Sequence, residues 1–201
     1  ELPSQIMENW CWEREALELF ARHWRTCEPV PEALFEKMVA ARRFMGGWSQ
    51  MRQLSFGTLD LALHDRLAPG LRASAAQAAG DDVLDAAQGA EVMAYAREHY
   101  LGFSATPRFA DLHGLTAFTH VFAGGYAAGY YSYLWSEVLD ADAFTRFRSE
   151  GVFNRDTGRA YVDAILSRGD SDDPEILFRE FMGRDPDPGA LLERNLGPAP
   201  E

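Results

Sequence analysis

The apolar residues of this chain recur at helical spacing in one stretch after another, and this pattern limits the fold more than any other feature. The first stripe predicts a helix that begins within Glu1-Leu2-Pro3-Ser4 and runs to about Arg25, and its members are Ile6, Trp10, Leu17, Phe20 and Trp24. Similar patterns predict further helices over residues 32–45, 49–67, 82–99, 141–150, 157–167, 174–182 and 188–195. No stretch alternates convincingly between apolar and polar residues, so we expect an all-α, multi-helix fold.

Prolines and glycines mark the expected boundaries between these helices. Gly46-Gly47 should break the second helix, and Gly169 suits a left-handed helix end. Asp173-Pro174 and Asp187-Pro188 each place a capping residue before a first-turn proline. We expect the last two helices to bury their apolar side chains, namely Leu177, Phe178, Phe181, Leu191 and Leu192. The Ala-rich segment 69–82 is either a short helix or a connection, and 101–112 should be a loop.

The composition excludes several classes of protein. A formal net charge of −12 argues against nucleic acid or an anionic membrane as a partner. No apolar run approaches the roughly 20 residues that span a bilayer, and no signal-peptide pattern is visible. Cys11 and Cys27 are interpreted as reduced thiols of a cytosolic protein. The histidines form no His-x-x-x-His pair, so spacing predicts no self-contained zinc site. His64 is interpreted as structural.

Aromatic residues and glycines are densest between Phe118 and Trp135. Tyr126, Tyr130 and Tyr133 follow at offsets of four and three, which predicts that they share one helical face. Gly124-Gly125 permits a sharp turn and the close approach of a ligand. From the residues alone, the ordinary interpretation is a pair of core helices with a glycine hinge, because aromatic stripes at this spacing are usually buried.

The same stretch closely resembles the glycine-and-tyrosine loop of the thimet oligopeptidase family of zinc metallopeptidases, and Phe122-Ala123-Gly124-Gly125 is most similar to its bacterial oligopeptidase A branch. Matching blocks follow in the family's order at residues 2–13, 53–57 and 165–169. The resemblance implies that residues 1–201 are a single all-α C-terminal portion of a larger metallopeptidase. This portion would form one wall of a zincin-like peptidase channel, with the catalytic His-Glu-x-x-His region missing upstream.

The resemblance also implies a role for Glu1, which stands before the Leu-Pro-Ser-Gln string. In this family a glutamate at that point is the third protein ligand of the catalytic Zn²⁺, while two histidine ligands and the general base lie outside this chain. Glu8 matches a glutamate that we expect near the metal in a supporting position. The residues alone favour a simpler interpretation, since Glu1 and Glu8 are seven apart and share one solvated face.

The loop carries the other implied roles. Tyr133 would be the oxyanion donor, with His120 as a second catalytic residue. Tyr126, Gly124 and Gly125 would contact the substrate. Without the resemblance, His120 is interpreted as a core histidine. Tyr130 and Tyr131 are expected in the core, and Trp48 and Trp135 are expected to serve packing.

The full-length protein is thus expected to be a cytoplasmic zinc oligopeptidase that hydrolyses short peptides. Its partners would be those peptides and the remaining N-terminal part of the enzyme. This chain alone should be inactive, and its exposed apolar interface could drive oligomer formation. Two alternatives stay open. One is a non-catalytic all-α peptide-binding or scaffold protein, and the other is the dipeptidyl carboxypeptidase branch of the same family.

Overall fold

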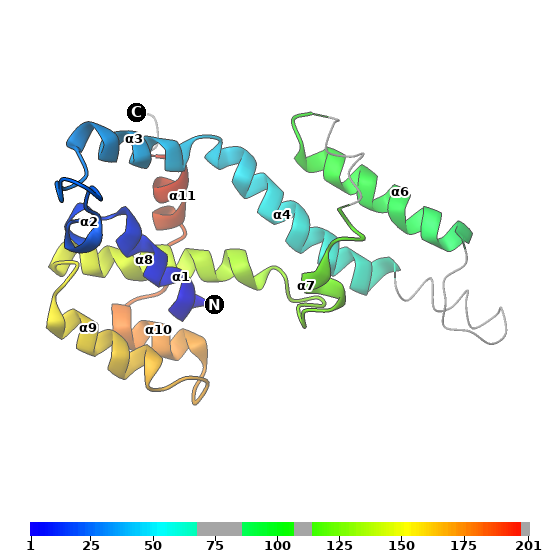
Figure 1. Cartoon of the computed structure of the whole chain (residues 1–201). Helices are drawn as coiled ribbons and strands as arrows, with labels where there is room; N and C mark the ends of the chain where they lie inside the picture. The colour runs from blue at the N-terminus through cyan, green and yellow to red at the C-terminus, as the bar shows by residue number, and fades with distance from the viewer. Residues whose placement is uncertain (68–85, 107–113, 198–201) are drawn as a thin grey trace. The chain divides into compact units, whose positions relative to one another are not determined.

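The computed structural model describes residues 1–67, 86–106 and 114–197, and within these ranges the chain is helical and contains no β-strand (Figure 1). One isolated antiparallel bridge joins Arg22 and Pro29. The expected all-α class is confirmed. The expectation for 69–82 and most of the expected loop at 101–112 lie outside the described residues.

The chain divides into two compact units. The first, called the terminal unit, combines Glu1–Gly46 with Trp135–Glu201. The second, called the central unit, is Gly47–Leu134. No helix in the described ranges is both long and apolar enough to cross a membrane.

The terminal unit is built from shorter helices around the long helix α8 (Ser132–Glu150, from Trp135 onward). The others are α1 (Leu2–Glu8), a 3₁₀ turn (Asn9–Trp12), α2 (Arg14–Phe20), α3 (Glu32–Arg43), α9 (Arg155–Tyr161) with a π-helical turn (Val162–Leu166), α10 (Pro174–Met182) and α11 (Gly189–Leu196). Their buried core is Ile6, Ala143, Phe144, Phe147, Val152, Tyr161, Ile165, Leu177, Phe178 and Phe181.

Local capping rules hold well for α10. The Asp173 side chain accepts a hydrogen bond from the N–H of Glu175, Pro174 begins the helix, and Gly183 ends it at a φ of 73°. The three residues predicted to be buried in α10 are in the core. In α11, Leu191 is buried as predicted, but the prediction for Leu192 is wrong, because its side chain is 52% exposed.

The prediction of one continuous first helix is wrong. The helix is interrupted after α1 by the 3₁₀ turn and by Glu13, whose backbone is extended (φ −98°, ψ 131°). The cause is tertiary. The Asn9 side chain donates to the Asp140 carboxylate at 2.8 Å, and the Trp10 indole donates to the carbonyl of Val152 at 2.9 Å. These partners on α8 and the following turn fix a geometry that a continuous helix does not supply.

The central unit contains α4 (Gly46–Ala62, from Gly47 onward), a π-helical turn (Leu63–Leu67), α6 (Ala86–Phe103) and α7 (Thr119–Phe122). Leu59, Leu63, Ala96 and Leu115 form its buried cluster. Helix α6 ends at Phe103, four residues past the predicted end at residue 99.

The predicted break at Gly46-Gly47 falls earlier, at Phe44 and Met45, where Met45 has a φ of 58°. Gly46 instead begins α4. A Cβ atom there would lie 2.2 Å from the carbonyl oxygen of Asn195, so only glycine allows this approach to the end of α11.

Candidate functional site

The segment between α7 and α8 is a turn rather than a helix. Gly125 has a φ of +81°, and a Cβ on Gly124 would lie 2.9 Å from the Cα of His120. The N–H of Tyr126 closes the turn by donating to the carbonyl of His120 at 3.0 Å. The prediction that Tyr126, Tyr130 and Tyr133 share one helical face is therefore wrong, since α8 begins only at Ser132.

Tertiary folding nevertheless gathers these rings into one group, which we call the aromatic cluster: His120, Tyr126, Tyr130 and Tyr133. Tyr126 and Tyr133 stack with ring centroids 4.9 Å apart. The His120 ring centre lies 5.9 Å from each of them and 5.8 Å from Tyr130. The predicted site residues of the loop thus come together in space.

Exposure within the cluster differs from residue to residue. His120 is exposed, so the core interpretation of this histidine is wrong, while the three phenol rings are half-buried. Tyr131 was expected in the core but is 50% exposed. Trp135, expected to serve packing, is 67% exposed. The cluster therefore presents a histidine at a surface backed by phenols.

The phenol of Tyr130 stays neutral at ordinary pH. Burial raises its pKa above the usual value, and the neighbouring Arg52 guanidinium acts in the opposite direction. A neutral phenol is a hydrogen-bond donor. Tyr130 also meets Phe118 edge-on, with centroids 4.9 Å apart, so its ring is fixed from the side of the core.

One buried carboxylate binds the backbone of this loop, and its role was not predicted from the sequence. Asp60 on α4 is fully buried. Its Oδ1 accepts the N–H of Ala128 and its Oδ2 accepts the N–H of Tyr130, both at 2.9 Å. His64 Nδ1 lies 3.0 Å from Oδ1 and 2.8 Å from the carbonyl oxygen of Asp60. Since both neighbours are acceptors, Nδ1 carries the hydrogen.

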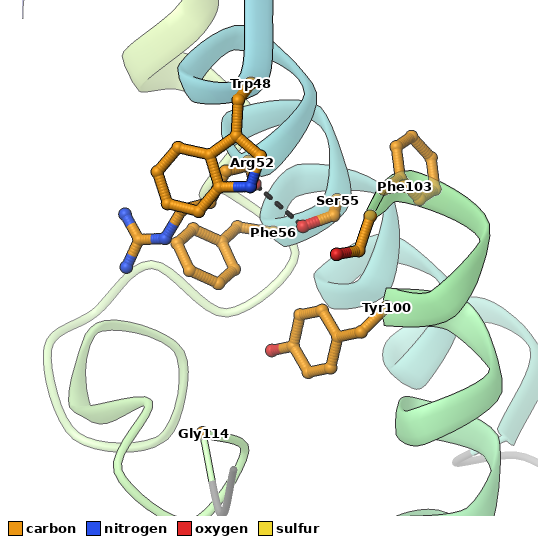
Figure 2. A pocket seen from close by; sticks show the side chains of 8 residues that line it. Trp48, Arg52, Ser55, Phe56, Tyr100, Phe103 and Gly114 are labelled. Carbon is orange, nitrogen blue, oxygen red and sulfur yellow. Dashed lines mark hydrogen bonds between the residues drawn. The ribbon is translucent and has the colours of Figure 1, made fainter. Parts of the chain in front are cut away.

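A small pocket of about 140 Å³ opens in the central unit between α4 and α6 (Figure 2). It is lined by Trp48, Arg52, Ser55, Phe56, Tyr100, Phe103, Ser104 and Gly114. The Arg52 guanidinium lies 4.5 Å from the centre of the Phe56 ring, and the buried Tyr100 hydroxyl has no hydrogen-bond partner. The other contacts of Phe56 include Tyr130, with ring centroids 5.7 Å apart, so this pocket adjoins the aromatic cluster.

In the terminal unit, Glu1 stands immediately before α1 and Glu8 is the last residue of α1, and both are exposed. The Ser4 hydroxyl donates to the Glu1 carbonyl at 2.8 Å and lies 3.5 Å from its carboxylate. In the described part of the chain, no three His, Cys, Asp or Glu side chains gather in a way that could hold a metal ion. A zinc site would therefore need ligands besides the described side chains, and Glu1 could contribute one carboxylate to it.

Comparison with known proteins decides the family. The profile of peptidase family M3 matches residues 1–196. The chain belongs to peptidase family M3. Among M3 relatives, oligopeptidase A of Escherichia coli is 46% identical over 193 residues, which are 96% of this chain and 26% of that protein. The probable cytosolic oligopeptidase A of Arabidopsis thaliana is 40% identical over 97% of the chain and 26% of its own length.

A second M3 branch is more distant. The dipeptidyl carboxypeptidase of E. coli is 34% identical over 92% of the chain and 25% of its own length. The chain thus spans about a quarter of the curated relatives that it matches. The resemblance to this group of peptidases that the loop and the flanking blocks indicated is confirmed.

Proposed function

We propose that this chain is the C-terminal part of a cytoplasmic, zinc-dependent oligopeptidase that hydrolyses peptide bonds in short peptides. Residues 1–201 would form one all-α portion of that enzyme and one wall of its channel. The chain is more similar to oligopeptidase A than to dipeptidyl carboxypeptidase, which supports the oligopeptidase A branch of the family. The observation that carries the proposal is the aromatic cluster, in which exposed His120 lies beside the stacked rings of Tyr126 and Tyr133.

Each residue of the loop has a distinct task in this proposal. The Tyr133 hydroxyl donates a hydrogen bond to the carbonyl oxygen as negative charge develops there, and the stiff aryl arm limits its movement. His120 is a second donor, and the Tyr126 ring contacts the peptide. Gly124 and Gly125 carry no side chain, so the peptide backbone can approach the turn closely.

The metal would be held by Glu1 together with the two histidines expected outside this chain, and Glu8 would support that site. Zinc, when bound, polarises the scissile carbonyl and lowers the pKa of a bound water.

The full-length protein tests the role of Tyr133. Replacing Tyr133 by phenylalanine removes the hydroxyl and keeps the ring, so kcat should fall on the order of 10²–10³-fold while zinc content stays unchanged. Tyr131→Phe is the matched control, because that ring is outside the cluster, and its kcat should equal that of the unmodified enzyme. An unchanged kcat for Tyr133→Phe would refute the role.

A separate variant tests the metal ligand. Glu1→Gln in the full-length protein should lower the zinc content measured after dialysis against a weak chelator, because a neutral amide is a poorer zinc ligand than a carboxylate. Glu15→Gln, an exposed position on α2, is the control. Equal zinc content in both variants would remove Glu1 from the ligand set.

Two alternatives are separated by product analysis. Dipeptidyl carboxypeptidases remove dipeptides from a free C-terminus, so a peptide with a C-terminal amide distinguishes them from an oligopeptidase that cleaves internally. Mass spectrometry should show internal cleavage of the amidated peptide by the full-length protein. Binding of peptides without any hydrolysis would favour the scaffold alternative. The 201-residue chain alone should show no peptidase activity.

A further inference from the structure

The structure assigns a positioning role to Asp60: its buried carboxylate fixes the loop that carries the aromatic cluster. This inference rests on the proposed function and names the group that holds its loop in place. Asp60 lies 68 and 70 residues before the two amides that it binds, so the contact is tertiary. Both amides belong to the segment between Tyr126 and Tyr133, which precedes most of α8 and whose own backbone hydrogen bonds are those of turns.

The carboxylate suits this task because it offers an acceptor on each oxygen. One oxygen binds the N–H of Ala128 and the other binds that of Tyr130, while His64 Nδ1 donates to the backbone carbonyl of Asp60 and lies 3.0 Å from Oδ1. The carboxylate has no solvent contact, so these two amide hydrogen bonds satisfy it inside the protein, with the imidazole close by. An asparagine at this position would present one acceptor and one NH₂ group. One of the two loop amides would then face a donor and lose its partner.

A second residue of α4, Gly57, also packs against the loop that Asp60 binds. Gly57 lies three positions before Asp60, hence on the same face of the helix. A Cβ on Gly57 would lie 3.3 Å from the Cα of Tyr131 and 3.4 Å from its Cβ. Helix α4 therefore meets the loop through a carboxylate that binds its amides and a glycine that admits its backbone. Disturbing either residue should displace the loop.

The ring contacts explain how a displacement would reach the site. Tyr130 contacts Tyr133 at a centroid distance of 5.1 Å, and Tyr133 stacks on Tyr126. The amide that Asp60 binds at Tyr130 is thus one ring contact away from the proposed oxyanion donor. Misplacing a catalytic group by about 1 Å can cost on the order of 100-fold in rate.

The test uses the full-length protein and two readouts. Hydrogen exchange, measured by mass spectrometry on fragments covering residues 126–131, reports the amides that Asp60 binds. Steady-state kinetics separates kcat from KM. In Asp60→Asn, exchange in this segment should rise at least about tenfold, and kcat should fall at least about tenfold with KM changed less than about threefold. Gly57→Ala should act in the same direction without a change of charge.

Matched controls exclude a general loss of stability. Asp142→Asn alters another buried carboxylate, in the terminal unit, and Gly89→Ala alters a helical glycine whose Cβ would meet nothing within 4 Å. Neither should change exchange at 126–131 or kcat per folded molecule.

The outcomes separate this inference from the proposed function. Faster exchange together with reduced kcat in Asp60→Asn and Gly57→Ala supports the positioning role. Unchanged exchange overturns the contact, and faster exchange with unchanged kcat overturns the role of that contact in catalysis. The proposed function fails on its own terms if Tyr133→Phe leaves kcat unchanged, whatever exchange shows at residues 126–131.

Discussion

Replacing Arg194 by methionine tests the polar network inside the terminal unit. Asp140 on α8 is nearly fully buried, and it accepts hydrogen bonds from Arg194 of α11 at 2.5 Å and from Asn9 at 2.8 Å. Arg194 also donates to the Asn9 side-chain oxygen at 3.2 Å. The Arg194 side chain is only 10% exposed. Methionine fills similar space but leaves the carboxylate without its paired cation.

The magnitude follows from these contacts. Removing one partner of a buried ion pair costs about 3–5 kcal/mol of the free energy of unfolding, because a buried charge is left uncompensated. Asn9 still donates to the carboxylate, and Arg42 is a second cation near it. Burial, followed by the repulsion of Arg194, lowers the pKa of Arg42 to about 10, with Asp140 acting in the opposite direction. These compensations place the expected loss near the lower end, at about 3 kcal/mol.

Hydrogen exchange of the α8 amides in the full-length protein measures this loss locally, which suits a chain with two compact units. The double variant Arg194→Met/Asp140→Asn leaves no unpaired charge, so it should be less destabilised than Arg194→Met alone. A loss below about 1 kcal/mol in the single variant, or an equal loss in the double variant, would refute the account of a buried charge.

Three further predictions concern stability. Phe144→Ala should lower the free energy of unfolding of the terminal unit by about 3–5 kcal/mol, because the residue is 1% exposed and lies in the core. Hydrogen exchange of the α8 amides measures this loss, and a loss under about 1.5 kcal/mol would contradict the packing. Asp173→Ala should cost about 1 kcal/mol by removing the cap of α10, whereas exposed Asp170→Ala should cost almost nothing. Burial lowers the pKa of His99, while its hydrogen bond to the Ser55 carbonyl acts in the opposite direction, so the unfolded chain binds the proton more readily. The central unit should therefore lose stability as pH falls through the usual histidine value of 6.5, and exchange in α6 should show a weaker pH dependence in His99→Gln.

Local rules predicted the parts of the fold that depend on neighbours in sequence. The cap at Asp173 and the buried face of α10 follow from a few consecutive residues, and the structure has both. The break between Asn9 and Glu13 could not be predicted this way. It depends on Asp140 and Val152, which are more than a hundred residues away along the chain.

The candidate site shows the same division. The family resemblance identified His120, Tyr126 and Tyr133, which the structure gathers, although the helical face assumed for the tyrosines is wrong. Asp60 was missed. The available signal was an acidic residue between Leu59 and Leu61, four positions before His64, which is an unusual place for a charge in an apolar helix. Nothing in the sequence, however, connects that carboxylate to the amides of Ala128 and Tyr130.

Ala128 adopts a φ of 55°, a left-handed conformation that costs a residue with a Cβ about 1–2 kcal/mol and that glycine adopts freely. The loop therefore has two unequal ends. Gly125 has open space around its would-be Cβ, whereas Ala128 is held in its costly conformation by the hydrogen bond to Asp60. Without that hydrogen bond, Ala128 could return to a negative φ, so the loop would change shape first at Ala128.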